Sequence, residues 1–310
     1  MATLYDQAKN NTRKTFLLIS FFAIFIIFLG SLFSYVLDSS FLLYLSVIIS
    51  IGMSVSSYWF SDKLVLATTG AVAIEKKDSP ELYLLVENLC ITTGVPMPKI
   101  YILDEDQPNA FATGRDENHA VIAVTRGLLE KLERAELEGV LAHELSHVRN
   151  KDMLLQTVVV VLAGSIAILS DFFLRARFFS NRNRNENSSP VFMIIALVAA
   201  ILAPVAATII KLAISRQREF LADASGALIT RYPEGLARAL EKISRDPNKM
   251  QRESNAVAHL FISSPLKGEG ENSWLSKLFM THPPVEERVA ALRGIMLSPD
   301  ENNIIESYNK

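Results

Sequence analysis

The stretch that decides the fold class is TFLLISFFAIFIIFLGSLFSYVL, residues 15–37, which contains no charged side chain. A second uncharged stretch, FLLYLSVIISIGMSVSSYWF, follows at residues 41–60 after the short link Asp38-Ser39-Ser40. Because a helix rises about 1.5 Å per residue, either stretch is long enough to cross a bilayer core of roughly 30 Å. We therefore predict a tight pair of membrane-spanning helices near the start of the chain.

Two further apolar stretches lie later in the chain, at residues 153–170 and 191–210. The first of these is shorter and carries Gln156, while the second contains Pro204, which predicts a kink. Each can be a membrane span or a buried helix of a soluble core. If both span the membrane, residues 171–190, rich in Asn, Arg and Ser, form a polar loop between them.

The composition excludes several classes of protein. Half of the 310 residues are hydrophobic (50%) and the mean hydropathy is +0.24, which is too apolar for a disordered chain and unusual for a soluble enzyme. The net charge of −2 argues against a basic nucleic-acid-binding protein, so we expect no nucleic-acid partner. The single cysteine, Cys90, excludes an intramolecular disulfide framework and a Cys-x-x-Cys metal site.

The apolar stretches divide the chain into alternating membrane and soluble parts. We predict an N-terminal membrane hairpin at 1–60, a soluble segment at 61–152, a second membrane hairpin at 153–210 and a second soluble segment at 211–310. An even number of spans puts both soluble segments on the same side of the membrane. The excess of Lys and Arg near the span ends favours the cytoplasm for that side and for the N-terminus, although the arginines of 171–190 oppose it.

The soluble segments predict mainly helices with a small sheet. Alternating apolar runs predict three strands, the last two forming a hairpin: 98–103, 109–113 and 119–124. Helical patterns cover other parts of the first soluble segment: 79–93, 125–134 and 135–152. We therefore expect a membrane protein that is mainly α-helical, with four transmembrane helices and an α+β domain that contains a small edge sheet.

The residues that carry chemistry are HELSH, residues 143–147, within the helix-forming stretch AELEGVLAHELSHVRNKD. His143 and His147 are four residues apart, so on a helix they share one face and can reach one metal ion at about 2.0–2.1 Å. Zinc lowers the pKa of its water to about 7, and Glu144 is placed to take the proton. The alternative is a polar helix face with two solvated histidines.

A catalytic zinc site needs a third protein ligand and an open position for water. The residues after His147 lack the glycine and third histidine of the extended H-E-x-x-H-x-x-G-x-x-H pattern. The best candidate is Glu219 in SRQREFLADASGA, with Asp223 one helical turn later as an acceptor that orients a ligand histidine. Spacing alone also allows Glu219 to be an ordinary surface residue.

HELSH, then EFLAD after an apolar hairpin, then FMTHPPVEER together resemble the HtpX family of membrane-embedded zinc metallopeptidases, which are relatives of the prenyl-protein endopeptidases. The resemblance covers nearly the whole chain and includes NAFATG. It implies one zinc ion per chain, held by His143, His147 and Glu219, with Glu144 as the general base. The two soluble segments then form the two halves of one cytoplasmic catalytic domain.

The same resemblance assigns roles to two further groups. Asn109, Ala110 and Phe111 resemble an edge strand that aligns an extended substrate through its backbone, with a purely structural strand as the alternative. His282 and Arg288 resemble a pair that stabilises the oxyanion of the transition state. Their alternative is a turn at the start of a helix with a solvated arginine.

The family implies proteolysis of misfolded or damaged membrane proteins during stress, as part of protein quality control in the bacterial inner membrane. The expected partners are membrane-protein substrates and the lipid bilayer, with duties shared with other quality-control proteases. Two other functions stay open. A processing protease for lipidated or specific substrates is disfavoured because four spans enclose a smaller chamber than the prenyl-specific relatives have. A catalytically silent metal-binding scaffold has no use for the base Glu144.

Overall fold

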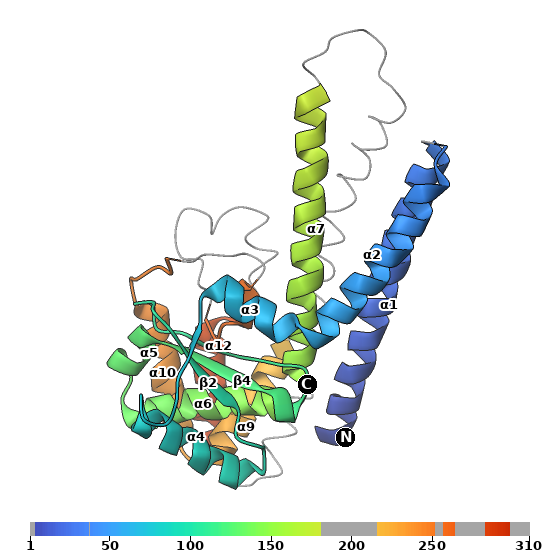
Figure 1. Ribbon diagram of the computed structural model, residues 1–310. Helices are drawn as coiled ribbons and strands as arrows, with labels where there is room; N and C mark the ends of the chain where they lie inside the picture. The colour runs from blue at the N-terminus through green and yellow to red at the C-terminus, as the bar shows by residue number, and fades with distance from the viewer. Residues whose placement is uncertain (1–3, 37, 181–215, 252–256, 264–282, 298–310) are drawn as a thin grey trace.

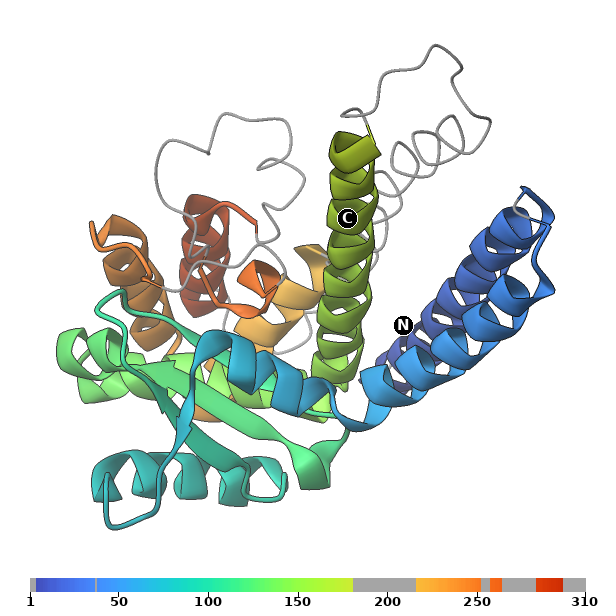
Figure 2. The same cartoon turned by 45° about the horizontal axis from the view of Figure 1, so that its top comes forward.

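A computed structural model describes residues 4–36, 38–180, 216–251, 257–263 and 283–297. In this part of the chain three long helices extend from one side of a compact domain that is built from helices and one small sheet (Figure 1). A second view shows the same separation between the long helices and the domain (Figure 2). The main part of the fold is helical, as the sequence predicts.

The predicted N-terminal hairpin is formed by α1 (Leu4–Val36) and α2 (Ser40–Trp59), which pack side by side. Both helices are long and apolar enough to cross a membrane, α1 over the range Lys9–Tyr35. Large apolar side chains are exposed along both, including Ile24 at 67% and Ile48 at 67%. Such a surface is suited to contact with lipid.

The third apolar stretch lies in α7 (Asp152–Ser180). Its described apolar segment, Asp152–Ile166, is below the length of a candidate span, and the whole apolar stretch 153–170 lies inside this helix. The fourth stretch, 191–210, lies outside the described residues. Two candidate spans are therefore present in the described chain, and four remain a prediction.

The predicted loop at 171–190 is wrong in its first half, because α7 continues as a helix to Ser180. Residues 171–180, DFFLRARFFS, contain no glycine or proline, and Leu, Ala and Arg favour a helix. Polar composition therefore did not mark the end of this helix. Residues 181–190 lie outside the described part of the chain.

A four-stranded sheet with the order β1-β2-β4-β3 lies in the middle of the domain. Its strands are β1 (Val72–Ala73), β2 (Lys99–Leu103), β3 (Ala110–Thr113) and β4 (Val121–Thr125). The predicted hairpin is confirmed, since β3 and β4 are antiparallel with Ala112 opposite Ile122. The parallel pairing of β2 with β4 was not predicted, and it leaves β3 at an edge of the sheet.

Helices cover both faces of the sheet. The remaining described helices are α3 (Ser61–Thr69), α4 (Pro80–Thr93), η1 (Glu117–His119), α5 (Arg126–Lys131), α6 (Arg134–Arg149), α9 (Arg216–Thr230), α10 (Pro233–Arg245), η2 (Ala258–Leu260) and α12 (Val285–Leu297). One buried cluster joins sheet residues such as Ile122 to Leu141 of α6 and Leu236 of α10. The two soluble segments therefore share one core. The other face of the sheet packs on α3, α7 and η2, where Phe111 meets Phe261.

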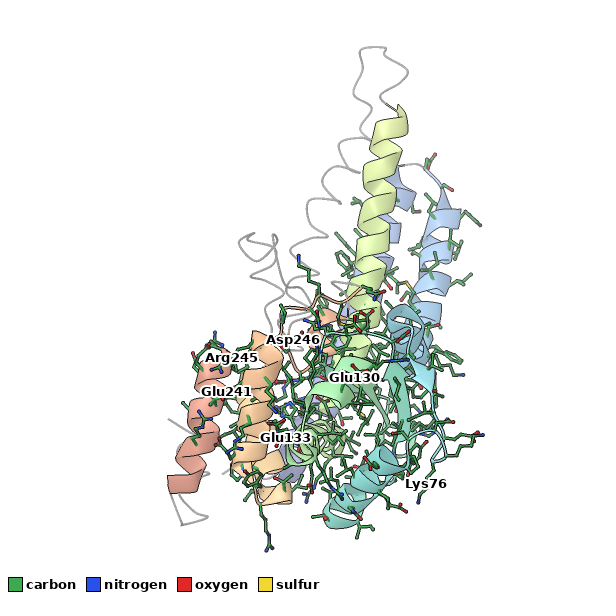
Figure 3. The ribbon with its side chains drawn as sticks, turned by 90° about the vertical axis from the view of Figure 1, so that its left-hand side faces the viewer. Lys76, Glu130, Glu133, Glu241, Arg245 and Asp246 are labelled. Atoms are coloured by element: carbon green, nitrogen blue, oxygen red, sulfur yellow. The ribbon has the colours of Figure 1, made fainter. Side chains whose placement is uncertain are left out.

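The start of α6 is fixed by polar contacts on the side of the domain that Figure 3 displays, near Glu133 and Asp246. Glu133 and Glu136 form a reciprocal capping box, in which each side chain accepts a hydrogen bond from the other residue's backbone. Glu136 also pairs with Lys242 of α10 at 2.8 Å. These contacts orient α6 before it reaches the HELSH segment.

Candidate metal centre and active site

The helices α6 and α9 approach each other closely beside His143. A Cβ atom on Gly226 would lie 3.1 Å from the backbone nitrogen of His143 and 3.3 Å from its Cα. Residues seven apart lie on the same face of a helix, so this contact also turns Glu219 toward α6. The absence of a side chain at position 226 thus allows α9 to supply a third group to the histidine pair.

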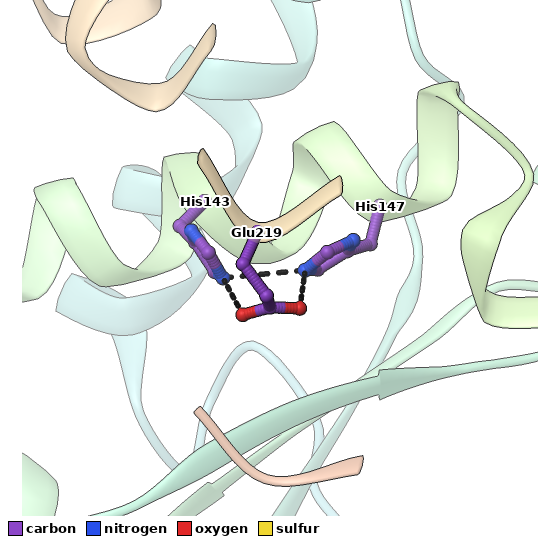
Figure 4. A group of neighbouring side chains, drawn as sticks. All are labelled: His143, His147 and Glu219. Carbon is purple, nitrogen blue, oxygen red and sulfur yellow. Dashed lines mark hydrogen bonds and ion pairs between the residues drawn. The ribbon is translucent and has the colours of Figure 1, made fainter. Parts of the chain in front are cut away.

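The side chains of His143, His147 and Glu219 converge (Figure 4). The two Nε2 atoms are 3.2 Å apart, and Glu219 places Oε2 3.9 Å from His143 Nε2 and Oε1 3.6 Å from His147 Nε2. Four tetrahedral ligands at about 2.0–2.1 Å from zinc lie about 3.3 Å apart. These donor atoms therefore fit a metal ion, and no other such His, Cys, Asp and Glu group is found among the described residues.

Each histidine also meets a carboxylate on its other ring nitrogen. Asp223 Oδ1 lies 2.9 Å from His143 Nδ1, and Asp152 Oδ2 lies 3.1 Å from His147 Nδ1. This arrangement places the proton on Nδ1 and leaves the lone pair of Nε2 for a metal. Asp223 was named from the sequence, whereas Asp152 was missed because it lies beyond the turn that ends α6, where Lys151 has a φ of 56°.

The two histidines differ in pKa. Burial lowers the pKa of His143 to about 4, against the opposing effect of Asp223. Burial also disfavours the charged form of His147, but the hydrogen bond to Asp152 and the charge of Glu219 outweigh it and raise the pKa to about 9. A metal binds the neutral imidazole, so the carboxylates that raise the pKa of His147 also make metal binding at this site dependent on pH.

Glu144 lies on α6 between the two histidines and is only 2% exposed. Burial raises its pKa to about 7, while the charge of His147 and a hydrogen bond from the backbone N–H of Ala112 oppose the shift. A carboxyl group with a pKa close to neutrality can both accept and return a proton near pH 7. Its position and pKa suit a general base.

Arg288 of α12 is completely buried and reaches the same site. Its Nε and Nη2 donate to Asp223 at 2.8 and 2.6 Å, and its Nη1 lies 3.8 Å from Glu219 Oε2. Burial raises the pKa of Asp223, but the charge of Arg288 outweighs this effect and the net shift is downward. Arg288 therefore supports the carboxylates, while its oxyanion role stays a prediction. His282 lies outside the described residues.

The outer edge of β3 is partly covered by the chain itself. The backbone N–H of Ile262 donates to the carbonyl of Ala110 at 2.9 Å. The side chain of Asn109 donates to the carbonyl of Ser263 at 2.8 Å and accepts from its N–H at 3.3 Å. A substrate backbone could pair with Asn109 and Ala110 only after residues 262–263 move away.

The remainder of β3 lies closer to the candidate base. Phe111 is completely buried and packs edge-to-face on Phe261, with ring centroids 5.0 Å apart. Its side chain therefore supports the strand and does not face a substrate. The backbone N–H of Ala112, the residue after Phe111, donates to the Glu144 carboxylate, so β3 contacts the candidate base at Ala112. The substrate role of Asn109, Ala110 and Phe111 stays a prediction.

Comparisons with known proteins show the family of this chain. The family model described as Peptidase family M48 matches residues 76–296, which include α6, α9 and α12. The chain belongs to peptidase family M48. This M48 peptidase is therefore a metalloprotease, a hydrolase that depends on a metal ion.

Curated relatives carry a more specific name. A protein named "Protease HtpX homolog" from Tropheryma whipplei is 44% identical over 290 residues, covering 94% of this chain and 98% of that one. A protein of the same name from Thermoanaerobacter pseudethanolicus is 44% identical over 305 residues, covering 95% of this chain and 99% of that one. The crystal structure of S. mikatae Ste24p gives a TM-score of 0.49 at 19% identity, covering 93% of this chain and 67% of that one. This M48 peptidase is thus of the HtpX type.

The close contact at Gly226 makes a prediction for this M48 peptidase. Gly226→Val is expected to lower the melting temperature and the metal affinity together, because the added carbon atoms push α9 and Glu219 away from His143. Overpacking of this kind costs about 1–3 kcal/mol. Thermal unfolding in detergent and zinc competition with a chelator measure the two effects.

Gly294→Val is the matched control, because a Cβ at this exposed helical glycine meets nothing within 4 Å. Both variants exchange a helical glycine for the same residue, so the change in helix propensity is equal. Equal melting temperatures and equal metal affinities for the two variants would contradict the role assigned to Gly226.

Proposed function

We propose that this M48 peptidase is a zinc-dependent endopeptidase that cleaves misfolded or damaged membrane proteins as part of membrane-protein quality control. The observation that carries the proposal is the buried Glu144 beside the converging His143, His147 and Glu219, in a domain joined to an apolar helix pair. Two imidazoles and one carboxylate are ligands that suit zinc and leave a fourth position open.

The side chains of the site have different roles in peptide hydrolysis. A zinc ion held by these ligands would polarise the scissile carbonyl and acidify the attacking water. Glu144 would accept the proton of that water and return it to the leaving amine. Asp152 and Asp223 hold the imidazole rings through Nδ1, so the ligands need not rearrange during the reaction.

The position of the centre along α1 supports action close to the membrane surface. The side chain of Asn11 contacts Asp152, which contacts His147, and the uncharged run of α1 begins at residue 15. Four helical residues correspond to about 6 Å. The centre therefore lies about one turn outside the apolar run, at the level of lipid headgroups. Loops and termini of membrane proteins reach this level.

We assign the enzyme to the bacterial inner membrane as a multi-pass protein, with its N-terminus and active site in the cytoplasm. The excess of Lys and Arg on that side of the first hairpin supports this orientation. The partners are membrane-protein substrates and the bilayer, and the duties overlap with those of other quality-control proteases.

The proposal is tested with full-length enzyme reconstituted in liposomes with zinc. One substrate is a destabilised membrane protein, and the other is its cytoplasmic segment alone, added at the same total concentration. We expect the anchored substrate to be cut at least about tenfold faster, because the shared membrane raises its local concentration at the cleft. Equal rates for both would contradict the membrane-protein specificity. A lipidated copy of the segment serves as a third substrate, and cleavage of this copy alone would favour the processing enzyme.

A further inference from the structure

A polar side chain of the first membrane helix reaches the edge of the metal centre. Asn11 of α1 is only 4% exposed. Its Nδ2 donates to Asp152 Oδ1 at 2.6 Å and to the backbone carbonyl of Asn150 at 3.1 Å. Asn150 lies in the turn between α6 and α7, and Asp152 is the first residue of α7, 139 and 141 residues further along the chain. Figure 1 shows the N-terminal end of α1 beside the lower end of α7.

Asp152 connects this contact to a metal ligand. One of its oxygens accepts from Asn11, and the other lies 3.1 Å from His147 Nδ1. Asp152 is 1% exposed, so both contacts are shielded from water and the hydrogen bonds are charge-assisted. The orientation of the carboxylate, and through it the His147 ring, therefore depends on Asn11.

Arg218 makes this dependence stronger. Its Nε lies 4.0 Å from the same Asp152 oxygen that accepts from Asn11. Removing the Asn11 amide would let the guanidinium draw the carboxylate toward itself and away from His147. The neutral amide thus holds a buried carboxylate between a cation and an imidazole.

The remainder of α1 does not need Asn11 in order to dock. Apolar residues of α1, among them Leu18 and Phe22, pack on Leu154 and Val158 of α7. A buried amide in such an interface is costly unless its hydrogen bonds are made, and an apolar residue would pack there without that cost. Asn11 donates both of its hydrogen bonds to Asp152 and Asn150, which points to a role at the metal centre and away from simple anchoring.

We infer that Asn11 is a positioning residue of the metal centre, which couples the docking of the first membrane helix to the metal affinity of His147 through Asp152. The inference rests on the proposed metal site and goes beyond it, because it makes a membrane anchor part of the catalytic machinery. An enzyme whose α1 is displaced from α7 would bind its metal more weakly.

The test measures zinc affinity of the purified full-length chain in nanodiscs by competition with a chelator. Asn11→Ala is expected to weaken zinc binding by about tenfold, as loss of a group that orients a ligand typically does. Asn10→Ala is the matched control, since Asn10 is the exposed neighbour on the same helix, and its affinity should equal that of wild type. Equal affinities for both variants would overturn the inference.

A double-mutant cycle separates positioning from general packing. If Asn11 acts through Asp152, the double variant Asn11→Ala/Asp152→Ala binds zinc no more weakly than Asp152→Ala alone. Phe22→Ala loosens the packing of α1 on α7 but keeps the Asn11 amide, so it should lower the melting temperature and weaken zinc binding less than Asn11→Ala does. Additive losses, or an equal loss of affinity in Phe22→Ala, would overturn the inference.

The outcome is separable from that of the proposed function. Zinc bound by wild type and weakened in Asn11→Ala, with no substrate cleaved, would remove the proposed activity and leave the positioning role intact. Normal cleavage by wild type, with unchanged zinc affinity in Asn11→Ala, would support the proposed activity and remove the positioning role of Asn11.

Discussion

Replacing Glu144 with glutamine is expected to abolish peptide cleavage while zinc stays bound at about one ion per chain. The amide keeps the size of the side chain but cannot accept the proton of the attacking water. General-base catalysis contributes about 10²–10⁴-fold, so kcat should fall by at least about 100-fold. Because Glu144 is not one of the three converging ligands, the metal affinity should change little.

The measurement pairs cleavage of a reconstituted membrane-protein substrate with zinc determination on the same preparation. Glu138→Gln is the matched control, because Glu138 is a half-buried residue of the same helix outside the ligand group. It should keep full activity. Cleavage by Glu144→Gln at the wild-type rate would refute the role of this carboxylate, and loss of zinc from it would show that Glu144 acts on the metal instead.

The second large effect is expected for Glu219→Gln, which should empty the metal site and abolish cleavage together. The amide is a weaker ligand than a carboxylate, and its loss of charge removes the attraction for a divalent cation. Substitution of a group that only orients a ligand lowers metal affinity by about 10–100-fold. Loss of a ligand itself should therefore lower metal affinity by more than about 100-fold. Zinc content after dialysis against a weak chelator gives the result.

The control for this prediction is Gln217→Ala, an exposed position two residues earlier on α9. Circular dichroism of both variants shows whether the helices remain. Retention of one zinc per chain by Glu219→Gln, with an intact fold, would mean that another group completes the site. Loss of zinc from both variants would mean that α9 tolerates no change there, and the assignment of Glu219 would need an independent ligand probe.

Local patterns predicted the membrane hairpin, the helix of HELSH and the β3–β4 hairpin. Each of these depends on residues close together in sequence: an uncharged run, a four-residue spacing and a turn between two alternating segments. Glu219 was harder, because a glutamate on a helix has no local signature of ligation. The resemblance to a known family selected it, and the approach of α9 to α6 at Gly226 gives the physical reason.

Several expectations needed correction or extension. The polar composition of 171–190 predicted a loop, yet α7 continues to Ser180 because residues 171–180 contain no glycine or proline that would break a helix. The substrate role of Asn109, Ala110 and Phe111 stays a prediction, and the structure adds that Ile262 and Ser263 of the same chain bond to Ala110 and Asn109. Asp152 was not recognised as a partner of a ligand histidine.

The sequence by itself determined that the protein has an apolar hairpin and a metal-binding helix, because hydrophobic runs and helical spacing act over a few residues. Only the tertiary structure decided which carboxylate meets which histidine, that Asn11 reaches Asp152 across 141 positions, and that residues 262–263 cover part of β3. These contacts join segments that are distant in the chain. They form where packed helices bring polar groups together in a buried site, and such groups must find partners because burial removes water from them.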